Sequence, residues 1–162
     1  MQKVLVIGAP GSGKSTFSRA LAEKTSLPLV HLDLLYCNAD QIPGKREVFL
    51  SRLEEVLQGD AWIIDGHYKS TLQERLAACD TVFFLDYETD VCLSGIRARR
   101  GKARSDLPWV ETAEDTELLA FVRAFPTESR PRVLALLFAQ RDKTVHIFRS
   151  RAEASAFLAK LS

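Results

Sequence analysis

The chain contains few cysteines, no long apolar run and almost no net charge. Its three cysteines (Cys37, Cys79 and Cys92) are odd in number and lack a C-x-x-C spacing, which argues against a disulfide framework and a zinc site. No apolar run approaches the about 18 residues that a membrane-spanning helix needs, so we expect no membrane segment. The net charge of +1 provides no general attraction to nucleic acid or to an anionic membrane.

The composition is that of an ordinary globular protein. The 162 residues are 46% hydrophobic and 27% charged, enough to bury one core. We see no internal repeat or low-complexity segment and expect a single domain over residues 1–162. Because an apolar run begins next to the N-terminus, we expect no signal peptide. The reducing cytoplasm is therefore the predicted compartment. We also expect a monomer or a homodimer.

Short apolar runs alternate with segments of helical periodicity. Near-continuous apolar runs are typical of strands that are covered on both faces of a sheet. Strands that alternate with helices indicate a parallel sheet with right-handed crossovers, so we predict a three-layer α/β fold. The predicted strands are Val4–Ile7, Leu29–Leu32, Trp62–Ile64, Val82–Leu85 and Val145–Phe148.

The first predicted strand leads into a phosphate-binding loop. Residues Gly8–Ser15 fit the pattern G-x-x-x-x-G-K-[ST], with a predicted strand before them and a predicted helix after them, as the P-loop requires. Glycines let successive N–H groups point inward at phosphate oxygens, Lys14 would reach the β- and γ-phosphates, and the Ser15 hydroxyl would hold Mg²⁺. The alternative to a phosphate-binding loop is a glycine-rich turn before an ordinary helix. The residues predicted to bind ATP are Gly8, Ala9, Pro10, Gly11, Ser12, Gly13, Lys14, Ser15 and Thr16.

Aspartates follow three of the predicted strands, at the edge where such sheets bind ligands. Asp65 follows the third strand and is the predicted Mg²⁺ partner of Ser15; alternatively, it caps the turn at Gly66. Asp33 follows the second strand and would serve as a general base toward an acceptor hydroxyl, or would orient that hydroxyl. Alternatively, Asp33 is simply a solvated carboxylate at the end of the strand. Because side chains along a strand alternate with a period of two residues, His31 would lie on the same strand face as Asp33.

A cluster of cations lies between residues 97 and 104. We interpret it as part of a short lid, at about residues 97–115, whose Arg97, Arg100 and Arg104 would offset charge on the transferring phosphoryl group. A nucleic-acid patch and a solvated helix end are the alternatives. Arg130 lies on a segment that would return from the lid and could complete the clamp.

The acceptor is predicted to bind in the region of about residues 33–60, together with the turn after the third strand. Tyr36 and Tyr68 could stack on a ring or hydrogen-bond a polar group, although both also suit the edge of a core. The residues predicted to contact the acceptor are Asp33, Tyr36, Gly66, His67, Tyr68 and Arg130.

The order of these motifs resembles that of the bacterial DNA topology modulation proteins, which are related to adenylate, shikimate and gluconate kinases. The matching segments are GAPGSGKS, LVHLDLLY, WIIDGHY, the arginine-rich stretch, SRPR and VHIFRSRAEASAFL. The resemblance implies a P-loop NTPase fold with a five-stranded parallel sheet in the order 2-3-1-4-5. It also implies an acceptor region after strand two and a lid after strand four.

Carried over by residue, the resemblance assigns Lys14 and Ser15 to ATP and Mg²⁺. Asp33 falls where shikimate-type relatives hold the acceptor, and Asp65-Gly66 falls where adenylate kinase carries Asp-Gly. Two positions depart from the family pattern, Cys37 after the Tyr and His67 after the Asp-Gly, and both lie on the acceptor side.

The leading hypothesis is an ATP- and Mg²⁺-dependent phosphotransferase. Its acceptor would be a nucleoside, a nucleotide or a small hydroxylated metabolite. The alternative is a nucleotide-dependent regulator that acts on DNA topology or on a protein partner and has no small-molecule kinase activity.

Overall fold

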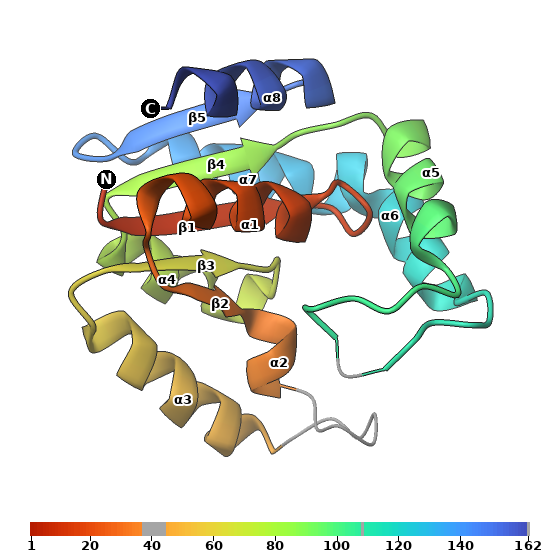
Figure 1. Ribbon diagram of the computed structural model, residues 1–162, viewed down its shortest axis with the longest axis horizontal. Coiled ribbons are helices and arrows are strands. Elements are labelled where there is room, and N and C mark those ends of the chain that lie inside the picture. Colours follow the sequence, from red (N-terminus) through yellow and green to blue (C-terminus); the bar gives the residue numbers. More distant parts are fainter. Residues whose placement is uncertain (37–44, 108, 162) are drawn as a thin grey trace.

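Five parallel strands form one sheet in the order β2-β3-β1-β4-β5 (Figure 1) in the computed structural model, which describes residues 1–36, 45–107 and 109–161. This order and the α/β class confirm the predicted fold. The strands are β1 (Lys3–Gly8), β2 (Leu29–His31), β3 (Trp62–Asp65), β4 (Thr81–Leu85) and β5 (Thr144–Phe148).

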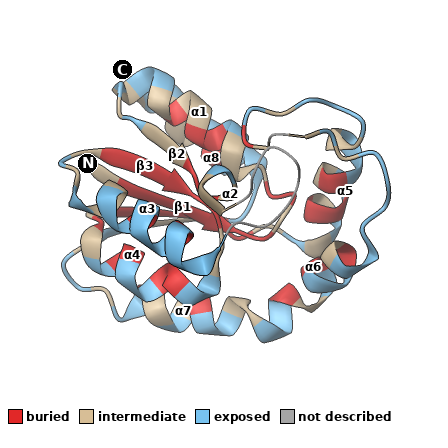
Figure 2. Ribbon diagram, turned by 90° about the horizontal axis from the view of Figure 1, so that it is seen from below, coloured by how far each residue is buried: buried red, intermediate tan, exposed pale blue. Residues whose placement is uncertain are grey.

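Helices cover both faces of the sheet, and α5 (Thr89–Arg99) and α6 (Thr116–Glu128) lie beyond its carboxyl edge (Figure 2). Helices α1 and α8 pack on one face, and α3, α4 and α7 pack on the other. The helices are α1 (Lys14–Thr25), α2 (Leu32–Tyr36), α3 (Arg46–Gln58), α4 (Leu72–Ala78), α5 (Thr89–Arg99), α6 (Thr116–Glu128), α7 (Arg130–Phe138) and α8 (Arg151–Lys160), with a 3₁₀ turn η1 (Lys69–Thr71). Among the described residues, none of these helices has the length and apolarity to cross a bilayer.

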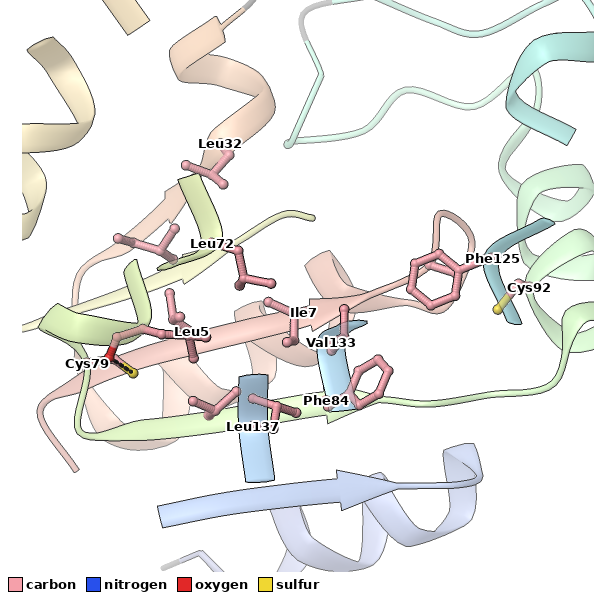
Figure 3. Close-up of a cluster of buried hydrophobic side chains, with 14 of the residues drawn as sticks. Leu5, Ile7, Leu32, Leu72, Cys79, Phe84, Cys92, Phe125, Val133 and Leu137 are labelled. Carbon is pink, nitrogen blue, oxygen red and sulfur yellow. Dashed lines mark hydrogen bonds between the residues drawn. The ribbon is translucent and has the colours of Figure 1, made fainter. Parts of the chain in front are cut away.

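The central strand β1 divides its side chains between two apolar layers. Leu5 and Ile7 pack with residues of α4 and α7 (Figure 3), whereas Val4 and Val6 pack with α1 and α8 on the opposite face. All four are fully buried, and burying one such side chain contributes about 1.5–3 kcal/mol. This burial on both faces explains why the strand reads as a continuous apolar run.

Aromatic rings fill the layer between the sheet and α8. Phe83 packs against Phe17, with ring centroids 5.1 Å apart, and His146 of β5 stacks on Phe83 at 5.0 Å and 12°. His146 also contacts Phe157 of α8 at 4.8 Å. Burial in this apolar setting lowers the pKa of His146 from its ordinary value of 6.5.

The second predicted strand is shorter than expected. β2 ends at His31, and Asp33 is the second residue of α2 rather than a strand-end residue. The reason is helical spacing: Leu32 is fully buried, and Leu35 and Tyr36 pack against the same core. The predicted sharing of a strand face by His31 and Asp33 was therefore wrong.

Two further local features are the start of α8 and the cysteine side chains. Ser150 caps α8 by accepting a hydrogen bond from the Glu153 amide at 3.2 Å, as the S-x-x-E pattern predicts. Cys79 and Cys92 are buried free thiols, whereas Cys37 lies outside the described residues.

The P-loop packs backbone to backbone against α5. Gly11 and Gly13 have φ values of 79° and 92°, which favour glycine. A Cβ on Gly11 would lie 2.0 Å from the Cys92 carbonyl oxygen, and one on Gly95 would lie 2.1 Å from the Gly11 carbonyl oxygen. The loop and the helix can approach this closely only because glycine is present on both sides.

The substitution Gly95→Ala will destabilise the chain. Alanine favours a helix over glycine by about 1 kcal/mol, but a Cβ 2.1 Å from Gly11 O forces the P-loop and α5 apart, at a cost of about 1–3 kcal/mol or more. Urea unfolding will show a lower free energy of unfolding than that of the unmodified chain. The control is Gly59→Ala, where the Cβ would lie 3.1 Å from the Val56 carbonyl oxygen; equal stability of both variants would contradict the packing argument.

The stability of the chain will depend on His146 below neutral pH. Its pKa in the folded chain lies below 6.5, so between these two pKa values the unfolded chain binds more protons. Stability is then lost as pH falls through this window. Urea unfolding at pH 7 and pH 5 will show a smaller acid-induced loss for His146→Gln than for the unmodified chain. An identical pH dependence in both proteins would contradict this prediction.

Candidate active site

A cleft of about 950 Å³ opens at the carboxyl edge of the sheet. Its walls come from the P-loop, α2, the turn after β3, the cleft-facing side of α5 and the segment between α5 and α6. The predicted site residues that line it are Pro10, Gly11, Gly13, Lys14, Ser15, Thr16, Asp33, Asp65, Gly66, His67, Tyr68 and Arg104. The structure therefore brings donor-side and acceptor-side residues into one cavity.

The P-loop has a buried base and a cleft-facing rim. Gly8, Ala9 and Ser12 are buried beneath the cleft, and the Ser12 amide donates to the Ala9 carbonyl at 3.2 Å. Lys14 folds back over the loop, and its Nζ donates to Ala9 O at 3.0 Å. Burial lowers the pKa of Lys14, although the carboxylates of Asp65 and Asp33 oppose that effect. An anion entering the loop would therefore meet an ammonium group held inside the cleft.

Asp65 is held by a histidine. Its Oδ2 lies 2.7 Å from Nδ1 of His31, and both side chains are buried. Burial lowers the pKa of His31, but the hydrogen bond and the charge of Asp65 outweigh it, so the pKa of His31 is raised. The neighbouring strands β2 and β3 pair His31 with Asp65 in register. Asp65 thus lines the cleft with His31 as its partner, and its role toward Mg²⁺ stays a prediction.

The hydroxyl of Ser15 faces a carboxylate that the sequence analysis did not identify. Ser15 Oγ donates to Asp106 Oδ2 at 2.7 Å. Arg104 donates to both oxygens of Asp106, from Nε at 2.9 Å and from Nη2 at 2.6 Å. Burial raises the pKa of Asp106, but the bonds from Arg104 and Ser15 outweigh it and hold that pKa well below its usual range. The only sequence signal was an aspartate two residues after the arginine cluster.

Glu111 ties the segment between α5 and α6 to the end of α5. Its Oε2 lies 3.0 Å from Arg99 Nε and 2.8 Å from Arg104 Nη1, and its carbonyl accepts from the Gly101 amide at 2.6 Å. These contacts fold the segment over the cleft, where the lid was predicted.

The lid arginines in the cleft are not all those that were predicted. Gly95, Ala98 and Arg99 of α5 line the cavity, a spacing that defines one helix face. Arg97 is exposed on another face of α5, and Arg100 points to Glu114 at 3.8 Å. Of these three predicted arginines only Arg104 lines the cleft, and Arg99, which was not predicted, lines it as well.

On the acceptor side, Asp33 and Tyr68 form a hydrogen-bonded pair. Tyr68 Oη donates to Asp33 Oδ1 at 2.6 Å. Tyr36 does not line the cleft; its ring packs edge-on to Phe49 at 5.3 Å and against Tyr68 at 5.6 Å. Tyr36 therefore supports the ring of Tyr68 from the core side.

The turn that carries Tyr68 is clamped by a buried arginine. Arg75 is fully buried and donates to the carbonyls of Gly66, His67 and Tyr68 at 3.0, 2.7 and 2.9 Å. Burial lowers the pKa of Arg75 to about 10. No motif marked this residue, because its partners are backbone carbonyls that only the fold brings together.

His67 lies in the cleft wall as an uncharged ring. It packs against Phe125 and Phe121, with centroid separations of 5.1 and 6.0 Å, and among the described residues neither ring nitrogen has a hydrogen-bond partner. Burial, with smaller contributions from the charges of Lys14 and Arg75, lowers the pKa of His67 to about 4. The ring is therefore neutral near pH 7.

Arg130 lies outside the cleft. Its guanidinium bonds to both oxygens of Asp86 at 2.8 and 2.9 Å, and Arg149 donates to the same carboxylate at 2.7 Å. Asp86 is buried at the end of β4. The structure thus places the predicted acceptor arginine in an ion-pair cluster between β4, β5 and α7.

The oxygen donors beside the P-loop fit a magnesium ion. Ser15, Asp65 and Asp106 offer hydroxyl and carboxylate oxygens, the hard ligands that Mg²⁺ prefers. Over residues 1–36, 45–107 and 109–161, no group of three or more His, Cys, Asp and Glu side chains could hold a metal. A cation here would therefore need phosphate oxygens and water to complete its shell.

Solved kinase structures share this architecture. A shikimate kinase from Bacteroides thetaiotaomicron is 22% identical, with a TM-score of 0.61 over 98% of this chain and 94% of that one. A shikimate kinase from Acinetobacter baumannii in complex with shikimate is 16% identical, with a TM-score of 0.65 over 99% and 90%. A gluconokinase from Sinorhizobium meliloti is 19% identical, with a TM-score of 0.56 over 99% and 93%.

Other comparisons returned nothing. No protein-family model matches the chain, and no curated protein matches it. The likeness to solved structures therefore shows that the chain shares the fold of these proteins, and it provides no support for the DNA topology modulation family in particular.

Proposed function

We propose that this chain is an ATP- and Mg²⁺-dependent phosphotransferase that acts on a small hydroxyl-bearing acceptor. One observation carries the proposal: a single cleft holds Lys14 and Ser15 of the P-loop on one side and the Asp33–Tyr68 pair on the other. Such a cleft suits a reaction that depends mainly on positioning two substrates and stabilising charge.

The donor phosphates would bind in the P-loop. Gly11, Gly13 and Lys14 line the cleft at the start of α1, where the unpaired backbone N–H groups of the first helical turn and the helix dipole favour an anion. Lys14 would exchange its bond to Ala9 O for a phosphate oxygen. When bound, Mg²⁺ would supply charge neutralisation on the β- and γ-phosphates, with Ser15 among its ligands.

Asp33 would take the proton of the acceptor hydroxyl. Its Oδ1 accepts from Tyr68, which fixes the carboxylate, and it lies near enough to Lys14 and Arg104 for its charge to affect the pKa of both. Asp33 lines the same cleft as Lys14 and Arg104, so an acceptor bound beside it would have its hydroxyl in the cavity that holds the donor phosphates. A carboxylate at hydrogen-bond reach is a suitable base for that hydroxyl.

Arg99 and Arg104 would close the site from above. Both guanidinium groups line the cleft, and a low-dielectric enclosure strengthens their interaction with developing phosphate charge. The same enclosure would keep water from competing with the acceptor.

Two observations support a hydroxylated acceptor that carries no phosphate. The arginines of α3 bond elsewhere: Arg46 donates to Ser70 Oγ at 3.5 Å and Arg52 donates to the Leu35 carbonyl at 3.2 Å. The similar structures include kinases named for shikimate and gluconate. A nucleoside or small hydroxylated metabolite therefore fits better than a nucleotide, whose phosphate would need free arginines.

The regulator hypothesis finds less support. Arg99, Arg100 and Arg104 each pair with a carboxylate of the lid segment, so these cations do not form a free basic surface for nucleic acid.

An acceptor screen tests the proposal. ADP release from Mg-ATP will be measured against nucleosides, nucleoside monophosphates and small hydroxylated metabolites, with Lys14→Ala as the blank. At least one acceptor will raise turnover roughly tenfold or more above hydrolysis, and Lys14→Ala will abolish the increase because it removes the phosphate-binding ammonium. A flat panel from protein that binds ATP would contradict kinase activity and favour a nucleotide switch.

Asp33→Asn will lower kcat with the acceptor so identified by roughly 10²–10⁴-fold, because the amide cannot accept the hydroxyl proton. Its affinity for ATP, measured by titration, will stay close to that of the unmodified chain. Asp60→Asn, at an exposed residue outside the cleft, is the matched control. Full turnover by Asp33→Asn would exclude the base role.

A further inference from the structure

The P-loop hydroxyl and the strand-end carboxylate have different partners in this chain. Asp65 Oδ2 lies 2.7 Å from His31 Nδ1, and Ser15 Oγ donates to Asp106 Oδ2. Asp106 lies 91 residues from Ser15 in the sequence and belongs to the segment that covers the cleft. The carboxylate in direct contact with the expected metal-binding hydroxyl thus comes from the lid.

Asp106 is unusually enclosed for a carboxylate on a covering segment. It is 4% exposed and lines the cleft beside the P-loop. Its negative charge is offset by Arg104, which donates to both of its oxygens at 2.9 and 2.6 Å. A buried carboxylate needs a cation or hydrogen-bond donors beside it, and here the cation is the guanidinium of Arg104.

We propose that Asp106 is a ligand of the divalent cation that accompanies the nucleotide, and that this cation replaces the Arg104 guanidinium at Asp106. The inference rests on the proposed function, because it assumes that the cleft binds a metal–nucleotide complex. Ser15 Oγ and Asp106 Oδ2 would be neighbouring ligands. Arg104, once released from Asp106, would be free to contact the phosphoryl group.

The spacing of the two oxygens supports this assignment. Ser15 Oγ and Asp106 Oδ2 are 2.7 Å apart, and neighbouring oxygens around an octahedral Mg²⁺ with bonds of 2.0–2.1 Å lie about 2.9 Å apart. The pair can therefore bind one ion with little movement of either element. The ion would bring two positive charges to a carboxylate that is now neutralised by one.

Arg104 has a second partner that would keep it in the cleft after the exchange. Its Nη1 donates to Glu111 Oε2 at 2.8 Å, and Glu111 is also paired with Arg99. Metal binding would thus place a ligand on the lid and release an arginine toward the substrates in the same step. A metal site open to water, with no ligand from the lid, could not be coupled to the lid in this way.

The test measures nucleotide affinity rather than turnover. A fluorescent N-methylanthraniloyl ATP will be titrated in Mg²⁺ and in EDTA against the unmodified chain, Asp106→Asn and Glu114→Gln. Glu114 is an exposed lid carboxylate outside the cleft and is the matched control. Asp106→Asn will lose roughly tenfold or more of the Mg²⁺-dependent gain in affinity without weaker binding in EDTA, and Glu114→Gln will keep the gain.

Two results would overturn the assignment. The first is an unchanged Mg²⁺-dependent gain in Asp106→Asn. The second is tighter binding by the same factor in Mg²⁺ and in EDTA, which would make Asp106 a latch that competes with nucleotide. Failure of the unmodified chain to bind the nucleotide under either condition would instead overturn the proposed function.

A second variant tests direct coordination. Asp106→Cys places a thiolate, which prefers soft metals, at the position of the carboxylate. The ratio of nucleotide affinity in Cd²⁺ to that in Mg²⁺ will rise roughly tenfold or more relative to the ratio for the unmodified chain. The same ratio in both proteins would show that the side chain does not touch the ion, and would overturn the proposal.

Discussion

The close backbone contact between the P-loop and α5 is the constraint on which the rest of the cleft depends. Glycines with positive φ in the loop and Gly95 in the helix let the two elements approach until a single added Cβ would clash. This contact fixes the loop at the end of β1 and aims one face of α5 at the cavity. It therefore determines which arginine of α5 lines the cleft, and Arg99 is the one on that face.

Paired charges and short hydrogen bonds hold the cleft together. Asp65 is paired with His31, Asp33 with Tyr68, and Asp106 with Arg104 and Ser15. On the proposed function, the metal ion, the nucleotide and the acceptor hydroxyl would each replace one of these internal partners. Before substrates bind, the internal pairs keep the cost of burying these polar groups low. They also hold the groups close to the positions that the proposed reaction requires.

Much of the fold could be predicted from local patterns, but less of the site. The strands and the P-loop depend on apolar runs and on a glycine motif that act within a few residues, and both were identified. Asp33 was expected at a strand end because its apolar neighbours also suit a strand, whereas the core selects them at helical spacing. Arg97, Arg100 and Arg130 could not be separated from Arg104 because helix facing and partners such as Asp86 arise only in three dimensions. Asp106 and Arg75 were missed for the same reason.

The central claim is that this cleft binds the phosphates of a nucleoside triphosphate, and calorimetric titration of Mg-ATP into the unmodified chain and into Lys14→Ala tests it most directly. The account predicts saturable binding at a single site with micromolar affinity in the unmodified chain, and a loss of roughly tenfold or more in Lys14→Ala, where a charged phosphate contact is removed. No detectable binding at millimolar Mg-ATP, or equal binding by both proteins, would contradict it.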